Sequence, residues 1–85
     1  MNRLETAKQK RDKAFLATVT SRAILLGYID GNKGIAHYIE KLLGCTYKTA
    51  QKRRDNPDSF TRAELIRLCS SLHLSAEERA NLLQS

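Results

Sequence analysis

The chain has 85 residues, of which 41% are hydrophobic, and a formal net charge of +6 at pH 7. This length allows one domain with a single modest core, and no apolar run reaches the roughly 18 residues that would predict a membrane span. Because the N-terminus is polar and charged, without an apolar signal segment, we expect a cytoplasmic protein.

The positive charge is concentrated in two segments. Residues 1–13 contain five basic and two acidic side chains, and residues 46–55 contain four basic and one acidic. The C-terminal part of the chain is close to neutral. Concentrated basic patches favour phosphate binding more than a uniformly basic surface does, although a solubilising surface would give the same net charge.

Residues 1–19 lack a steady apolar period, and we expect a basic N-terminal arm that is either flexible or a weak helix. The folded domain is expected to cover residues 20–85. Its first helix would begin after Thr20 or Ser21, each a suitable N-cap, and end at the glycine-containing turn 30–34. The apolar side chains at helical spacing in this segment are Ile24, Leu25, Tyr28 and Ile29.

A second and a third helix are expected on either side of Gly44. The second carries an apolar stripe made by Ile35, Tyr38, Ile39, Leu42 and Leu43. Glycine suits the sharp turn between the two helices because it tolerates positive φ. The third helix runs from about Thr46, whose hydroxyl can cap it, to Arg54, and Pro57 prevents its continuation.

Two further helices begin at sequences that fit the capping box, a hydroxyl residue followed three positions later by a carboxylate. These sequences start at Thr61 and at Ser75. No segment has a convincing strand pattern. We therefore predict an all-α fold, a compact bundle of about five short helices that contains a helix-turn-helix.

The third helix carries long hydrogen-bonding side chains and only one small apolar residue, Ala50. Such a helix contributes little to a core. At about 100° per residue, one face contains Tyr47, Lys48, Gln51 and Lys52. Lysine matches the acceptors of guanine in a major groove and glutamine matches adenine, so we predict that Lys48, Gln51 and Lys52 read bases. Tyr47, with a ring and a hydroxyl, is predicted to contact a base or a phosphate.

Phosphate contacts are predicted for the residues around this face. The start of the third helix offers free amide donors and positive partial charge, and Thr46 lies there. The full predicted phosphate set is Thr46, Thr49, Arg53, Arg54, Lys33 and Lys41. The basic arm is expected either to add phosphate or minor-groove contacts or to be a passive tail.

The segments IEKLLGCTYKTAQKRRDNP and FTRAELIRLCSSLHLS resemble the lambda-repressor-like (Cro/repressor-type) helix-turn-helix family of phages and mobile elements. The similarity covers roughly residues 20–76. It implies a small phage-type transcriptional regulator (repressor/Cro-like) that binds duplex DNA as a homodimer, with half-sites about 34 Å apart. The resemblance does not decide between a repressor and an activator. In the family, the positions of Tyr47, Lys48, Gln51 and Lys52 read bases, and that of Thr46 contacts phosphate.

The chain departs from this family at two positions. Glu40 stands where the family usually has alanine, and Arg53 stands where an apolar residue is common. A truly buried unpaired charge costs several kcal/mol. We therefore expect each charged group either to reach solvent on its stem or to be paired, and Glu40 and Arg53 could pair with each other across the two helices.

Other functions have weaker support from the sequence. The same scaffold can serve as a protein-interaction module, for example an antitoxin or a phage inhibitor of a host protein. Structured RNA is a third alternative, although few aromatic residues are available to stack on bases. For the homodimer, the candidate surface is the last helix, with Leu82 and Leu83, although the same leucines could instead close the core of the monomer.

We expect neither an enzyme nor a bound cofactor. No arrangement of nucleophile and base can be argued from the sequence. A zinc site is not expected, because the available ligands lack the paired close spacing of such sites. These ligands are His37, Cys45, Cys69 and His73. We expect the two cysteines to be buried free thiols.

Overall fold

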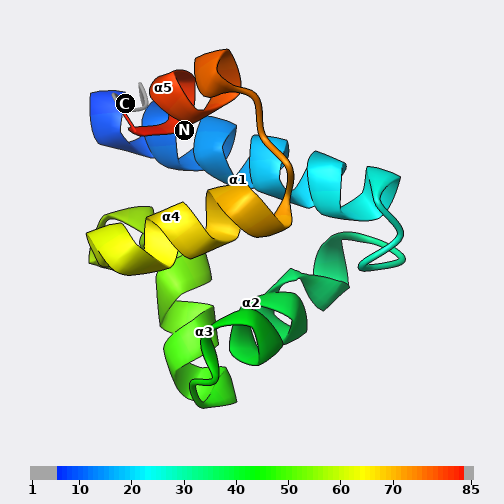
Figure 1. The fold of residues 1–85 in the computed structure, drawn as a ribbon. Coiled ribbons are helices and arrows are strands. Elements are labelled where there is room, and N and C mark those ends of the chain that lie inside the picture. Colours follow the sequence, from blue (N-terminus) through cyan, green and yellow to red (C-terminus); the bar gives the residue numbers. More distant parts are fainter. Residues whose placement is uncertain (1–5, 84–85) are drawn as a thin grey trace.

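The computed structural model describes residues 6–83, apart from the side chains of Asn32 and Leu83 (Figure 1). Within this range all regular elements are helical, which confirms the predicted all-α bundle. The α-helices are α1 (Ala7–Leu25), α2 (Ile35–Leu43), α3 (Tyr47–Asp55), α4 (Arg62–Ser71) and α5 (Ala76–Leu83). Two short 3-10 helices, η1 (Asn32–Gly34) and η2 (Pro57–Ser59), precede α2 and follow α3.

The first helix begins much earlier than the sequence pattern indicated. Thr6 caps α1 through a capping box with Gln9, and the helix then continues unbroken to Leu25. The expected helix start at residue 20 or 21 is therefore wrong, and the boundary expected between residues 19 and 20 falls inside α1. The part of the expected arm at residues 1–5 lies outside the described range.

Tertiary packing explains why α1 persists through a segment with several β-branched residues. Phe15, Val19 and Thr20 are buried along one side of the helix. Burial of this stripe outweighs the modest helix propensity of valine and threonine, which differs from that of alanine by about 0.7 kcal/mol at most. The N-terminal segment is therefore an integral part of the core and not a separate arm.

The end of α1 also differs from expectation, because the helix stops before Tyr28. Gly27 has φ +79°, and its N–H donates to the carbonyl of Ile24 at 3.0 Å. The N–H of Tyr28 donates to the carbonyl of Ala23 at 2.9 Å. These two bonds form a Schellman motif, which satisfies the last carbonyls of the helix and reverses the chain.

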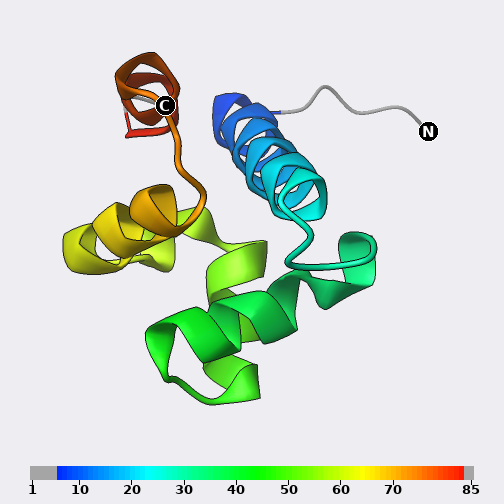
Figure 2. The same cartoon turned by 45° about the vertical axis from the view of Figure 1, so that its right-hand side comes forward.

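The core lies where α1, α2 and α4 meet, and α5 closes it on one side (Figure 1). The largest fully buried side chains are Ile35, Ile39, Leu68, Leu72, Val19 and Cys69. Turning the molecule by 45° shows α2 and α3 together at the end of the domain away from α5 (Figure 2). The α2–α3 pair is thus anchored to the core while one side of α3 remains accessible.

Leu82 belongs to this core and not to a dimer surface. Its side chain is 9% exposed and lies in the buried cluster that contains Phe15 and Phe60. The expectation that Leu82 forms the dimer surface is therefore wrong, because α5 uses this leucine to cover α1. The side chain of Leu83 lies outside the described part of the chain.

Candidate nucleic-acid interface

The turn between α2 and α3 is built by three residues with distinct backbone roles. Gly44 ends α2 with φ +65° and ψ 30°, a conformation that favours glycine. Thr46 is extended, with φ −73° and ψ 160°, and its Oγ1 accepts a hydrogen bond from the N–H of Thr49 at 3.2 Å. Both features were predicted and are confirmed. Helices joined by such a short turn form a helix-turn-helix.

Ala50 fixes the orientation of α3. It is the buried residue of that helix, with no exposed surface, and it packs into the core on the side of α2. On the opposite side Lys48 and Lys52 are exposed, Tyr47 is 36% exposed, and Gln51 is partly exposed. The structure therefore brings the four predicted base-reading residues onto one accessible side of the helix.

The two lysines of this surface differ from the two arginines that follow them on α3 in having no carboxylate partner among the described residues. Among the described residues, neither Lys48 nor Lys52 takes part in an ion pair or a side-chain hydrogen bond. Both ammonium groups are thus available to a ligand. We name the surface formed by Tyr47, Lys48, Gln51 and Lys52 the α3 face.

Arg53 points away from the α3 face and ties α3 to α4. Its Nε donates to Oε1 of Glu64 at 3.0 Å, and the two side chains are only 18% and 23% exposed. The suggested ion pair between Glu40 and Arg53 is therefore wrong. Glu40 instead lies beside His37, with 3.3 Å between Oε1 and Nδ1.

Glu64 also completes the cap of α4. Its carboxylate accepts from the N–H of Thr61 at 2.9 Å, and its own N–H donates to Oγ1 of Thr61 at 3.1 Å. Burial acts to raise the pKa of Glu64, but the hydrogen bonds from Thr61 and Arg53 outweigh it and lower the pKa below its ordinary value. One carboxylate thus serves both the start of α4 and the attachment of α3.

Arg54 is held by its neighbour in sequence. Its Nε and Nη2 donate to the two carboxylate oxygens of Asp55 at 2.8 and 3.2 Å. The hydrogen bond from Arg54 lowers the pKa of Asp55 below its ordinary value. Both arginines of the predicted phosphate set therefore already have carboxylate partners.

The remaining predicted phosphate residues lie on three elements. Thr46 and Thr49 stand at the start of α3, with their hydroxyls 3.1 Å apart. Lys33 is exposed in η1, and Lys41 is exposed on α2. Only the threonines belong to the same helix end as Tyr47.

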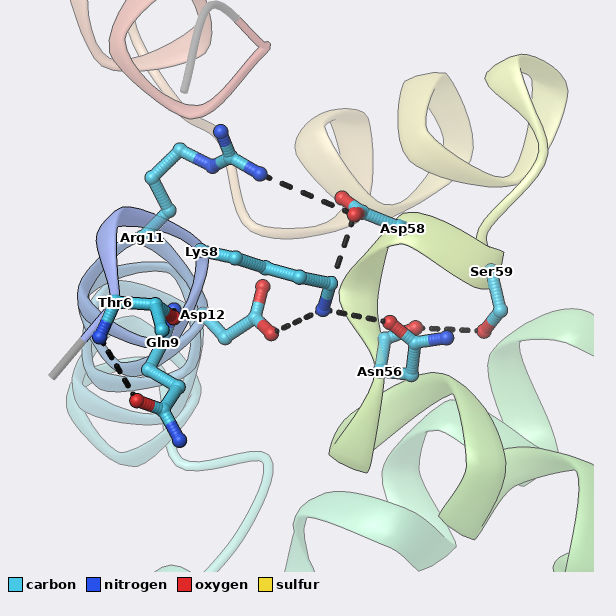
Figure 3. A network of polar contacts seen from close by, with 8 residues as sticks. All are labelled: Thr6, Lys8, Gln9, Arg11, Asp12, Asn56, Asp58 and Ser59. Carbon is cyan, nitrogen blue, oxygen red and sulfur yellow. Dashed lines mark hydrogen bonds and ion pairs between the residues drawn. The ribbon is translucent and has the colours of Figure 1, made fainter.

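The N-terminal part of α1 is attached to the segment that follows α3 (Figure 3). Lys8 Nζ lies 2.7 Å from Asp12 Oδ2, 3.0 Å from Asn56 Oδ1 and 3.8 Å from Asp58 Oδ2. Arg11 approaches the same Asp58 carboxylate at 3.9 Å. Part of the charge expected on a free basic arm is therefore neutralised within the domain, although exposed pairs of this kind contribute little stability.

One contact at the site was not anticipated from the sequence, the stacking of His37 on Tyr47. Their ring centroids are 4.4 Å apart and the rings are inclined by 23°. The two residues are ten positions apart, so the contact depends on the turn at Gly44 and not on helical spacing.

Comparison with protein-family models, curated proteins and solved structures finds no match to this chain. No group of three or more potential metal ligands occurs among residues 6–83, and both cysteines are free thiols, Cys69 buried and Cys45 half-buried. In the same range no helix is both long and apolar enough to cross a membrane.

Proposed function

We propose that this protein binds duplex DNA in a sequence-specific manner, as a small transcriptional regulator of the repressor type and not as an enzyme. The observation that carries the proposal is the division of α3 into two sides. One side contributes Ala50 to the core, and the other presents the α3 face with two unpaired lysines.

The α3 face suits a major groove in both shape and chemistry. A single α-helix fits this groove, where lysine can donate to guanine O6 and N7 and glutamine can pair with adenine N6 and N7. The start of α3 offers backbone N–H groups and the Thr46 hydroxyl to a phosphate. Lys33 and Lys41 would add backbone contacts, whereas Arg53 and Arg54 would first have to leave Glu64 and Asp55.

The experiment that tests this function is selection from a randomised duplex library at near-physiological salt, followed by sequencing. Wild type should enrich a palindrome whose half-sites lie about one helical turn apart. Binding that enriches no sequence and disappears as the salt concentration rises would mean that the protein is attracted only to the phosphate backbone of DNA. That result would contradict sequence-specific recognition.

The first variant for this selection is Lys48→Ala. We expect it to lose about 1 kcal/mol of affinity for the enriched duplex and to relax the preference at one base position. Lys10→Ala is the matched control, because Lys10 is an exposed lysine on α1 and the same charge is lost. The control should leave the preferred sequence unchanged, and an identical relaxation in both variants would contradict base reading by Lys48.

A homodimer requires a surface other than Leu82. Exposed apolar side chains gather at the end of α1, in Ile24, Leu25, Leu26 and Tyr28. Exposed apolar clusters of this kind are typical of protein interaction surfaces. We propose that this cluster forms the dimer contact; a protein-interaction module that binds a different partner, the alternative function, would use the same cluster.

Leu25→Lys tests the dimer contact without disturbing the core, because Leu25 is 77% exposed. A lysine at the last residue of a helix is also compatible with the helix dipole. We expect the variant to remain folded and to be monomeric in analytical ultracentrifugation, at concentrations where wild type is a dimer. Ile66→Lys, at an apolar residue on α4 that is 45% exposed, should dimerise as wild type does. Unchanged dimerisation of Leu25→Lys would exclude this surface.

A further inference from the structure

The ring of Tyr47, on α3, stacks on the imidazole of His37, which belongs to a different helix, α2. The imidazole belongs to α2 and the phenol ring to the first residue of α3, and their centroids lie 4.4 Å apart at an interplanar angle of 23°. The side chain of His37 is 63% exposed, so the stack lies at the surface and not in the core. Tyr47 therefore has an aromatic neighbour and is still 36% exposed.

Glu40 in turn holds His37. Its Oε1 lies 3.3 Å from Nδ1 of the imidazole, one helical turn away on α2. An ionised carboxylate can only accept, so Nδ1 carries the proton and donates. The imidazole is consequently fixed by a hydrogen bond on its edge and by a ring on its face. This contact also gives a reason for a glutamate at position 40, since Glu40 does not pair with Arg53.

A tyrosine on an exposed helix face samples several rotamers, and a ligand that needs one of them must pay for the ordering. Stacking on His37 selects one orientation of the Tyr47 ring before any ligand binds. The phenol hydroxyl is then presented in a defined direction at the start of α3. Prior ordering of this kind increases affinity and sharpens the discrimination between ligands that do and do not match the fixed group.

We propose that His37 is a positioning residue for base recognition by Tyr47, with Glu40 orienting the imidazole. The inference rests on the proposed function, because it assigns part of the sequence preference of the α3 face to a residue of α2. It predicts that the preference contributed by Tyr47 depends on an aromatic ring at position 37 and not on the charge of that side chain.

The experiment has two arms, and the first needs no DNA. Ring protons of Tyr47 are assigned by NMR in the free protein and in His37→Ala and His37→Phe. A stacked imidazole or phenyl ring shifts these protons, so the shift should be lost in His37→Ala and kept in His37→Phe. Tyr47 shifts that are the same in wild type and His37→Ala would overturn the inference whatever the protein binds.

The second arm repeats the randomised-duplex selection with wild type, His37→Ala, His37→Phe, Tyr47→Ala and the double alanine variant. His37→Ala should weaken, by about three- to tenfold, the preference at the same base position that Tyr47→Ala affects. Positions that depend on Lys48 should be unchanged. His37→Phe should restore the preference, and the double variant should be no worse than Tyr47→Ala.

The outcomes separate the inference from the proposed function. If wild type selects a sequence and His37→Ala selects the same one with equal strength, positioning by His37 is excluded while the DNA-binding function stands. Failure of His37→Phe to restore the preference, although its ring still shifts the Tyr47 protons in the first arm, would likewise exclude the ring stack as the cause. If wild type enriches no sequence, both the proposed function and the inference that rests on it are overturned.

Discussion

Replacing Ala50 with leucine is expected to destabilise the domain by about 3 kcal/mol and to abolish specific duplex binding. Ala50 has no exposed surface and lies where α3 packs into the core beside α2. A larger side chain at a filled position forces neighbours out of their rotamers or pushes the helices apart. Either response displaces the α3 face relative to the rest of the domain.

Urea unfolding followed by circular dichroism measures the loss of stability, and titration with the selected duplex measures binding. Ala63→Leu is the matched control, because Ala63 is exposed in the first turn of α4. The control should unfold at the wild-type midpoint and bind normally. If Ala50→Leu also unfolded at the wild-type midpoint, the close approach of α3 to the core would be refuted.

The features predicted correctly from the sequence are those specified within a few residues. Gly44, Thr46, Thr61 and Ser75 each form the turn or cap that was expected of them. These structures depend on the residue itself and on groups no more than four positions away, which a sequence displays directly. The α3 face was predictable for the same reason, since helical periodicity alone determines which residues share a side.

The features predicted wrongly depend on which elements meet in space. Arg53 bonds to Glu64, eleven residues away, because α4 passes that side of α3, and no local pattern distinguishes Glu64 from Glu40 as the partner. The stack of His37 on Tyr47 likewise depends on the path of the turn. Leu82 had two possible environments, the monomer core or an interface, and only the packing of α5 on α1 decides between them.

The start of α1 is a different kind of error, because its local information was present. Thr6 and Gln9 form a capping box with glutamine in place of glutamate. The segment lacks a steady apolar period, but burial against the core decides the conformation of a segment when its intrinsic propensity is weak.

Glu64→Gln is expected to destabilise the domain by about 2 kcal/mol at neutral pH. It should also make the free energy of unfolding depend less on pH in the acid range. The substitution removes the charge that faces Arg53, whose side chain is 18% exposed, and weakens the capping box of α4. Hydrogen bonds to charged groups contribute about 1.5–3 kcal/mol, and the cap about 1 kcal/mol, part of which glutamine retains.

The direction of the pH effect follows from the lowered pKa of Glu64. Its ordinary value is 4.5, and the pKa in the folded protein lies below this. The folded state therefore binds fewer protons than the unfolded state between the two values, so stability rises with pH across this window. The contribution of Glu64 is fully present above about pH 4.5 and is lost as the pH falls through the folded-state pKa.

Urea unfolding of wild type and Glu64→Gln between pH 3 and pH 7 measures this contribution as the difference in unfolding free energy. The difference should be largest at neutral pH and should shrink below about pH 4.5. Glu77→Gln is the control, because Glu77 is an exposed glutamate in the first turn of α5. Asp55 and Glu78 also have lowered pKa values and add to the acid sensitivity of every variant, so only the difference isolates Glu64. A constant difference across the whole pH range would mean that the Glu64 carboxylate is not what fastens α3 to α4.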